Sequence, residues 1–242
     1  LWIYRRAPPP GEWRLAQAHF LWGPRHTPKN WAPAGAGAPP RSAPFGLLVG
    51  WEPQLVFQLA AECAVQTHGA PAAYLTAGAY AVVVHGLARG ESLDGAVQRV
   101  LVLLAARPGH QPVTDALKHA LGAVRQGMPS AARVDELVGD GLAEGVLAVA
   151  VYCALVGEDI RHGLCLAVNH GGPSEATGAL CGGLLGALHG ETALPPGWVT
   201  ELEGRPTVLE LADDFAMEMT QGPALHSPAA SSPGWLARYP RA

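Results

Sequence analysis

The stretch from Val146 to Val156, VLAVAVYCALV, contains no charged side chain. At helical spacing its apolar residues cover more than one face, which is typical of a helix surrounded by other elements. It is about half as long as a segment that spans a bilayer. We therefore predict a helix over residues 142–157 that lies at the centre of a globular core.

Runs with helical periodicity, separated by Gly, Pro or Asp, continue on both sides of this stretch. Alanine, glycine and leucine dominate them and aromatic residues make up only 7% of the chain, a balance that favours packed helices over sheets. No alternating strand pattern and no repeat of fixed period is present. The sequence predicts an all-α fold with helices near 52–66, 71–89, 92–106, 112–126, 142–157, 159–168, 176–189 and 207–219.

The two ends of the chain lack this periodicity. Residues 1–50 are rich in proline, which prevents long helices, so we expect an irregular segment whose tryptophans attach it to a surface. Residues 222–242 are rich in Ser, Pro and Ala, and we expect a flexible surface tail. The predicted organisation is an irregular segment 1–50, a helical domain 51–221 and a tail 222–242. The chain begins with Leu1 rather than methionine, so a missing N-terminal part is one possibility.

Charge and cysteine content restrict the function. The formal net charge is -4 and only 15% of residues are charged, with no basic run that would indicate a nucleic-acid surface. Four cysteines stand far apart in apolar stretches without a Cys-x-x-Cys pair, as expected of buried free thiols in a reducing compartment. We expect a cytoplasmic protein that contacts neither nucleic acid nor membrane and has a small-molecule or protein partner.

The segment AVNHGGPSEATGAL, residues 167–180, carries the strongest indication of chemistry. It joins two predicted helices and places its polar groups at the N-terminus of the second, where free backbone N–H groups and the helix dipole attract anions. Beyond it, glycines recur every four residues from Gly178 to Gly190. That stripe predicts a helix face that another backbone approaches closely.

Several segments in order resemble the ADP-ribosylglycohydrolase family, which carries AVNHGGDSDSTGAI where this chain has AVNHGGPSEATGAL. The downstream LLGALHGETALPPGWVTELE, the upstream AEGVLAVAVYCAL, and RSAPFGL with Thr67-His68 resemble family segments at similar spacing. The resemblance covers about residues 30–215. It implies a compact, orthogonal multi-helix domain that hydrolyses the bond between ADP-ribose and an acceptor, so the implied partner is ADP-ribose or an ADP-ribosylated protein.

The resemblance also implies two Mg²⁺ or Mn²⁺ ions, which need several oxygen ligands. Matched by position, Pro173 replaces the first loop aspartate, Glu175 the second and Ala176 the hydroxyl ligand. Glu175 is therefore the candidate catalytic residue and, with Thr177, the candidate metal ligand; alternatively, Thr177 is an ordinary first-turn residue. The candidate ligand-binding residues are Gly35, Gly37, Arg41, His170, Gly171, Gly172 and Ser174, the last of which is also a candidate N-cap.

The family's N-terminal Thr-Asp-Asp cluster is absent from the printed sequence, and its glycine loop appears as AGAGAPPR at residues 34–41. We expect this loop and residues 170–177 to line one cleft. Three hypotheses remain: a metal-dependent hydrolase of weak or lost activity, an inactive ADP-ribose-binding or protein-interaction pseudoenzyme, and a piece of a longer enzyme. The last explains the missing cluster but not Pro173 or Ala176.

Overall fold

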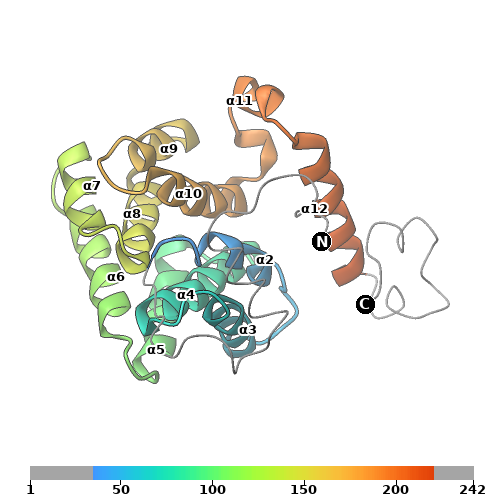
Figure 1. The fold of residues 1–242 in the computed structure, drawn as a ribbon. Coiled ribbons are helices and arrows are strands. Elements are labelled where there is room, and N and C mark those ends of the chain that lie inside the picture. The colour runs from blue at the N-terminus through green and yellow to red at the C-terminus, as the bar shows by residue number, and fades with distance from the viewer. Residues whose placement is uncertain (1–34, 221–242) are drawn as a thin grey trace. The chain divides into compact units, whose positions relative to one another are not determined.

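The computed structural model describes residues 35–220, which form helices and no strand (Figure 1). The predicted all-α fold class is confirmed. Outside the helices, Gly35 and Leu142 form an isolated antiparallel bridge. The described helices in chain order are η3 (Pro40–Ser42), α2 (Ala43–Gly46), α3 (Pro53–Val65), α4 (Pro71–Ala88), α5 (Leu93–Ala105), α6 (Gln111–Val124), α7 (Ala131–Val138), α8 (Ala143–Val156), α9 (Ile160–Val168), α10 (Ser174–His189), η4 (Glu191–Ala193), α11 (Pro196–Glu201) and α12 (Arg205–Thr220).

All the predicted helices are present, with ends that differ by at most two residues. The shorter helices α2, α7 and α11 were not predicted. The later part of the segment predicted as irregular contains η3 and α2, while residues 1–34 and the predicted tail 222–242 lie outside the described residues. The chain divides into two compact units, Leu1–Leu194 and Pro195–Ala242, of which the second contains α11 and α12.

Helices α4 and α8 form the centre of the first unit. Every residue of α8 from Gly145 to Cys153 is buried, which confirms the helix predicted from the apolar stretch. Helix α4 packs against α2, α3, α5, α8 and α10. It is long and apolar enough to cross a membrane by length and composition, but 78% of that window is buried inside the protein, as in the core helix of a globular domain.

Local signals set where these helices begin. Pro53 and Pro71 occupy the first helical position of α3 and α4, where the missing N–H of proline costs no hydrogen bond. Ser92 and Asp159 cap α5 and α9 by accepting backbone N–H groups at 3.2 and 2.7 Å. The α7 cap is of the same kind, because Ser130 accepts the Arg133 N–H at 3.3 Å. Ser130 is a typical N-cap residue and is the feature of the sequence that could have indicated the start of α7.

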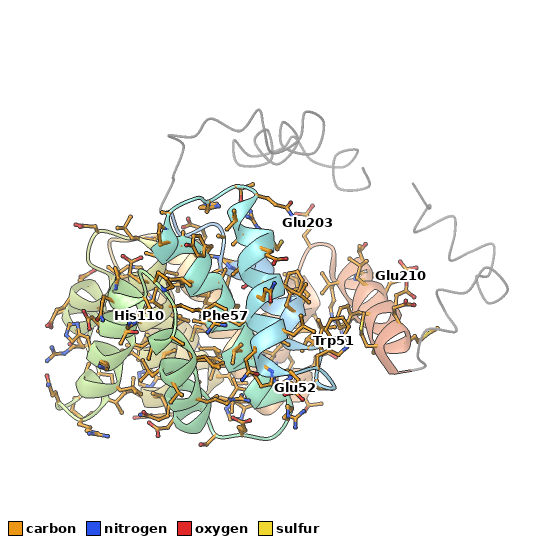
Figure 2. All side chains as sticks on the ribbon, turned by 90° about the horizontal axis from the view of Figure 1, so that it is seen from below. Trp51, Glu52, Phe57, His110, Glu203 and Glu210 are labelled. Atoms are coloured by element: carbon orange, nitrogen blue, oxygen red, sulfur yellow. The ribbon has the colours of Figure 1, made fainter. Side chains whose placement is uncertain are left out.

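Large side chains fit against small ones between the central helices. Phe57 projects from α3 into the helical packing (Figure 2) and is 1% exposed. A Cβ added to Gly78 of α4 would lie 2.6 Å from its ring, so glycine is required there. The Arg107 guanidinium lies 3.8 Å from the centre of the Phe57 ring, within cation–π distance.

The four cysteines are free, as predicted, but only two are buried. Cys153 of α8 and Cys181 of α10 lie in the core, whereas Cys63 and Cys165 are half-buried. Burial raises the pKa of the Cys153 thiol to about 12 and also raises the pKa of Cys181. The two buried thiols are therefore protonated and unreactive at neutral pH.

The glycine stripe of α10 does not face a closely packed backbone, so that prediction is wrong. A Cβ at Gly178 would lie 2.7 Å from the Val168 side chain, so the packing is tight there, but against a side chain and not a backbone. A Cβ at Gly182 would make an ordinary 3.5 Å contact, one at Gly186 would meet open space, and Gly190 ends the helix at a φ of 75°. The closest approach is at Gly183, outside the stripe, where a Cβ would collide with the Tyr80 hydroxyl. Helix α10 thus needs glycine to accommodate a side chain from α4.

Candidate functional site

The segment between α9 and α10 is held together by His170. Its Nδ1 accepts the Gly172 N–H at 3.0 Å, so Nε2 carries the ring proton of the neutral imidazole. Nε2 lies 2.9 Å from the Ala167 carbonyl oxygen and 2.8 Å from Thr177 Oγ1. His170 therefore connects the end of α9 to the first turn of α10, and both its ring nitrogens are used within the segment.

Thr177, a candidate metal ligand, is fully buried. Its hydroxyl donates to the Ala167 carbonyl at 2.5 Å, and the carbonyl oxygens of Pro173 and Ser174 lie 3.4 and 3.1 Å away. A hydroxyl has one proton to donate, and here it faces backbone acceptors of this segment. Thr177 thus stabilises the loop in the described structure, and its role as a metal ligand stays a prediction.

Glu175, the candidate catalytic residue, is exposed in the first turn of α10. It precedes Thr177 by two residues, so the two side chains leave the helix on nearly opposite sides. Ser174 is the first residue of α10 and Pro173 occupies the N-cap without a side-chain hydrogen bond. Ser174 is therefore not the N-cap, and no side chain caps the N-terminus of α10.

Asp135 of α7 contacts the loop between α9 and α10, and this contact was not predicted from the sequence. Its Oδ1 accepts the Gly171 N–H at 3.0 Å, which leaves that donor committed to the protein. The expected ligand contact of Gly171 stays a prediction that requires this carboxylate to move. A carboxylate near the loop could not be found from the sequence because α7 itself was not predicted.

The other candidate segment, residues 35–41, is held against α3. The Arg41 guanidinium donates to Thr67 Oγ1 and to the carbonyls of Cys63 and Ala64, the latter two at 3.4 and 3.3 Å. Thr67 Oγ1 in turn lies 2.8 Å from Nδ1 of the buried His68. Arg41 therefore binds the last carbonyls of α3, a usual role of a cation at a helix C-terminus.

Gly35 and Gly37 precede this arginine, and Gly35 lies near the side chain of His68. A Cβ added to Gly35 would lie 4.0 Å from His68 Nε2. Gly37 is half-buried. His68 thus lies beside the glycine segment. In the sequence, the Thr67-His68 pair that resembles a family segment was the feature that pointed to this residue.

The fold brings the two segments together around the turn before α8. Gly35 pairs with Leu142 in the isolated bridge. A Cβ on the preceding Gly141 would lie 3.0 Å from Cδ of Pro173, and η3 packs against α10. Segments more than a hundred residues apart therefore lie near each other, and the cleft predicted between them stays a prediction.

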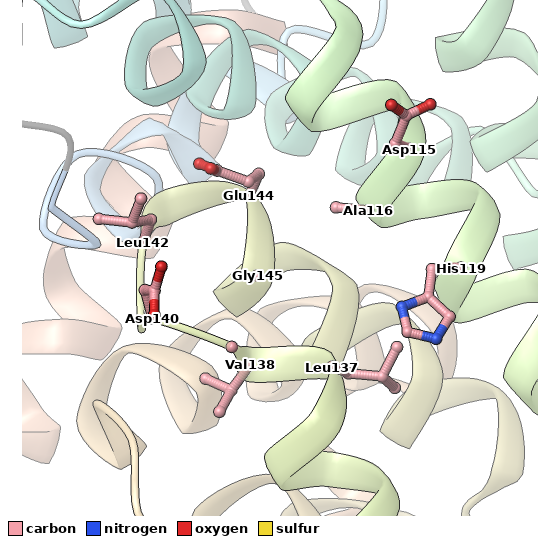
Figure 3. Close-up of a pocket in the computed structure, with 10 residues that line it drawn as sticks. Asp115, Ala116, His119, Leu137, Val138, Asp140, Leu142, Glu144 and Gly145 are labelled. Atoms are coloured by element: carbon pink, nitrogen blue, oxygen red, sulfur yellow. The ribbon is translucent and has the colours of Figure 1, made fainter.

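A pocket of about 360 Å³ lies between α6 and the turn that joins α7 to α8 (Figure 3). Neither candidate segment contributes to its walls. Two of its lining residues adjoin them: Leu142 is the bridge partner of Gly35, and Val138 lies beside Gly172. The expectation that both segments line one cleft is not met by this pocket. Its polar walls come from Asp115, His119, Asp140 and Glu144.

The divalent ions implied by the resemblance do not fit the donors in the described part of the chain. No group of three or more His, Cys, Asp or Glu side chains within residues 35–220 could hold a metal ion. Within residues 170–177 Glu175 is the one carboxylate, and the hydroxyl of Thr177 faces the opposite side of the helix. The carboxylate of Asp135, on α7, already accepts the Gly171 N–H. Hard cations prefer six or more oxygen ligands, so we derive no catalytic step through a metal.

Comparisons with known proteins agree with the sequence motifs and the fold. The model of the ADP-ribosylglycohydrolase family matches residues 5–224. A solved structure described as an ADP-ribosylglycohydrolase-related protein complex superposes with a TM-score of 0.68 at 28% sequence identity. That alignment covers 88% of this chain and 70% of the other. A search among curated proteins found no match. The family match over most of the sequence shows that this chain belongs to the ADP-ribosylglycohydrolase family.

Proposed function

We propose that this protein binds ADP-ribose, free or attached to a protein, and has weak or no metal-dependent hydrolase activity. The observation that carries this proposal is the arrangement of the first turn of α10. The loop retains an ordered hydrogen-bond network around His170, but Glu175 and Thr177 face opposite sides of the helix. The network supports ligand binding. The separation of the Glu175 and Thr177 side-chain oxygens argues against a metal site.

The uncapped N-terminus of α10 supports binding of the diphosphate. Pro173 provides no side-chain acceptor for the first turn, and the positive end of the helix dipole favours an anion there. Gly35 and Gly37 lie in the neighbouring segment, where the absence of a Cβ lets a ligand approach the backbone. The four free cysteines support a reducing, cytoplasmic location.

Hydrolysis is the competing function, and family membership favours it. Catalysis requires reacting groups to be held within tenths of an ångström, whereas binding draws on many dispersed contacts. Loss of carboxylate ligands should therefore reduce turnover before it reduces affinity. Residues 1–34 contain one carboxylate, Glu12, so this part of the chain cannot replace an aspartate pair.

Isothermal titration with ADP-ribose tests the proposal. We expect binding with an affinity that agrees within about twofold in Mg²⁺ and in EDTA, since no metal ion takes part in the proposed binding. Glu175→Gln should leave the affinity equal or slightly higher, because it removes a negative charge near the diphosphate. Glu158→Gln, an exposed glutamate before α9, is the matched control and should change nothing.

Release of labelled ADP-ribose from a modified protein distinguishes the two functions. Little or no release is expected, with or without Mg²⁺. Robust release that EDTA abolishes and that Glu175→Gln removes would establish the hydrolase instead. Absence of any ADP-ribose binding would reject the proposed function.

A further inference from the structure

Asp135 of α7 places a carboxylate on a backbone N–H of the candidate ligand-binding loop. Its Oδ1 accepts the Gly171 N–H at 3.0 Å. Gly171 is exposed and lies two residues before Pro173, the N-cap of α10. A backbone N–H has one proton to donate. This N–H can therefore donate to a phosphate oxygen of a ligand only after the Asp135 carboxylate has left it.

The packing of α7 keeps Asp135 beside the loop. The helix packs against α6, α8 and α9 (Figure 1). Its buried residues are Val134, Leu137 and Val138. Val138 lies three residues after Asp135, which places the two side chains close together on the helix surface. A Cβ added to Gly172 would lie 2.8 Å from Cγ2 of Val138. Helix α7 therefore covers Gly171 with a carboxylate and Gly172 with an apolar side chain.

The Asp135 carboxylate has one interaction in the part of the chain that the structure describes. Within residues 35–220 it makes no other hydrogen bond and no ion pair, and Asp135 is exposed. The neighbouring Glu136 differs, because it pairs with Arg133 and lies 3.3 Å from His119 Nε2. Rotation of the Asp135 side chain into water therefore breaks a single exposed hydrogen bond and requires no movement of α7.

We propose that Asp135 is an internal competitor of the anionic ligand: its carboxylate occupies the Gly171 N–H in the free protein, and the diphosphate of the ligand displaces it. This inference rests on the proposed function, because it assigns the Gly171 N–H to the diphosphate. A carboxylate and a phosphate both accept from an N–H, and they repel each other. They cannot share this donor, so the contact in the free protein lowers the affinity for the ligand.

The expected size of the effect follows from the exposure of the contact. A hydrogen bond to a charged group can shift an equilibrium by about tenfold or more, but solvent and salt weaken an exposed one. Asp135→Ala removes both the acceptor and the charge, so it should strengthen binding by about three- to tenfold. Asp135→Asn removes the charge and retains an oxygen that can accept the Gly171 N–H, so its gain should be smaller.

Isothermal titration of the full chain with ADP-ribose, and separately with inorganic pyrophosphate, tests the competition. At low salt we expect Asp135→Ala to bind both compounds about three- to tenfold more tightly than the unmodified chain. Glu136→Gln is the matched control, because it removes the same charge from the next residue of α7 without a contact to the loop. It should change the affinity by less than about twofold. Equal or weaker binding by Asp135→Ala, or equal gains in both variants, would overturn the proposal.

The Gly171 amide provides a measurement in the free protein. Its hydrogen exchange, corrected for intrinsic rates, should be at least about threefold faster in Asp135→Ala than in the unmodified chain, and pyrophosphate should slow it again. An unchanged exchange rate in Asp135→Ala would show that the carboxylate does not occupy this N–H.

The two titrations also distinguish failure of this inference from failure of the proposed function. If pyrophosphate binds Asp135→Ala more tightly but ADP-ribose binds no variant, the proposed function is wrong and the competition stands. If ADP-ribose binds all variants equally, the proposed function stands and the competition is wrong. If neither compound binds Asp135→Ala, the Gly171 N–H does not bind an anion and both are wrong.

Discussion

Replacement of Gly183 by alanine should destabilise the first unit by about 1–3 kcal/mol, the usual cost of an overpacked core. The added methyl group would collide with the hydroxyl of Tyr80, which is 1% exposed and donates to the Leu180 carbonyl at 3.3 Å. Tyr80 belongs to α4 and is almost fully buried, so its hydroxyl cannot move aside without displacing its neighbours. Urea denaturation followed by circular dichroism measures the loss.

Gly186→Ala is the matched control, three residues along the same helix. A Cβ there meets no atom within 4 Å, so the substitution should stabilise the protein by up to about 1 kcal/mol through helix propensity. Tyr80→Phe should rescue Gly183→Ala in part, because it removes the oxygen that the methyl group meets. Equal stabilities of Gly183→Ala and Gly186→Ala, or no coupling to Tyr80, would contradict this packing.

This pair of glycines shows what the sequence can and cannot predict about the fold. Periodicity predicted α10 within two residues because it depends on local spacing. The same periodicity indicated the four-residue stripe as the packing face, yet Gly183 lies outside that stripe. Its partner Tyr80 is about a hundred residues away, and helical spacing within α10 contains no information about a side chain on α4.

Some features of the candidate site could likewise be predicted from the sequence and others could not. Residues 170–177 and 35–41 were predicted from motifs, and the fold brings them together. The contact between Asp135 and Gly171 was not predicted, since it needs α7 in place. The hydrogen bonds of Arg41 to the end of α3 could not be predicted either. A motif shows which residue is present but not which atoms its side chain contacts.

The role of Thr177 can be decided by an isosteric substitution. Thr177→Val keeps the size of the buried side chain but removes the hydroxyl that contacts the Ala167 carbonyl and His170 Nε2. Loss of a buried hydrogen-bonding group costs about 1–3 kcal/mol. We expect the variant to be destabilised by that amount, measured by urea denaturation in EDTA, and to bind ADP-ribose about tenfold more weakly because the loop is less ordered.

The EDTA condition separates the structural role of Thr177 from the metal-ligand role. A residue that only coordinates a cation contributes nothing to stability when the cation is removed, since linkage requires a bound ligand. A hydroxyl that bonds the Ala167 carbonyl contributes whether or not Mg²⁺ is present. Thr177→Ser retains the hydroxyl and should preserve most of both stability and affinity. If Thr177→Val is as stable as the unmodified chain in EDTA but loses stabilisation by Mg²⁺, Thr177 is a metal ligand and the hydrolase function regains its support.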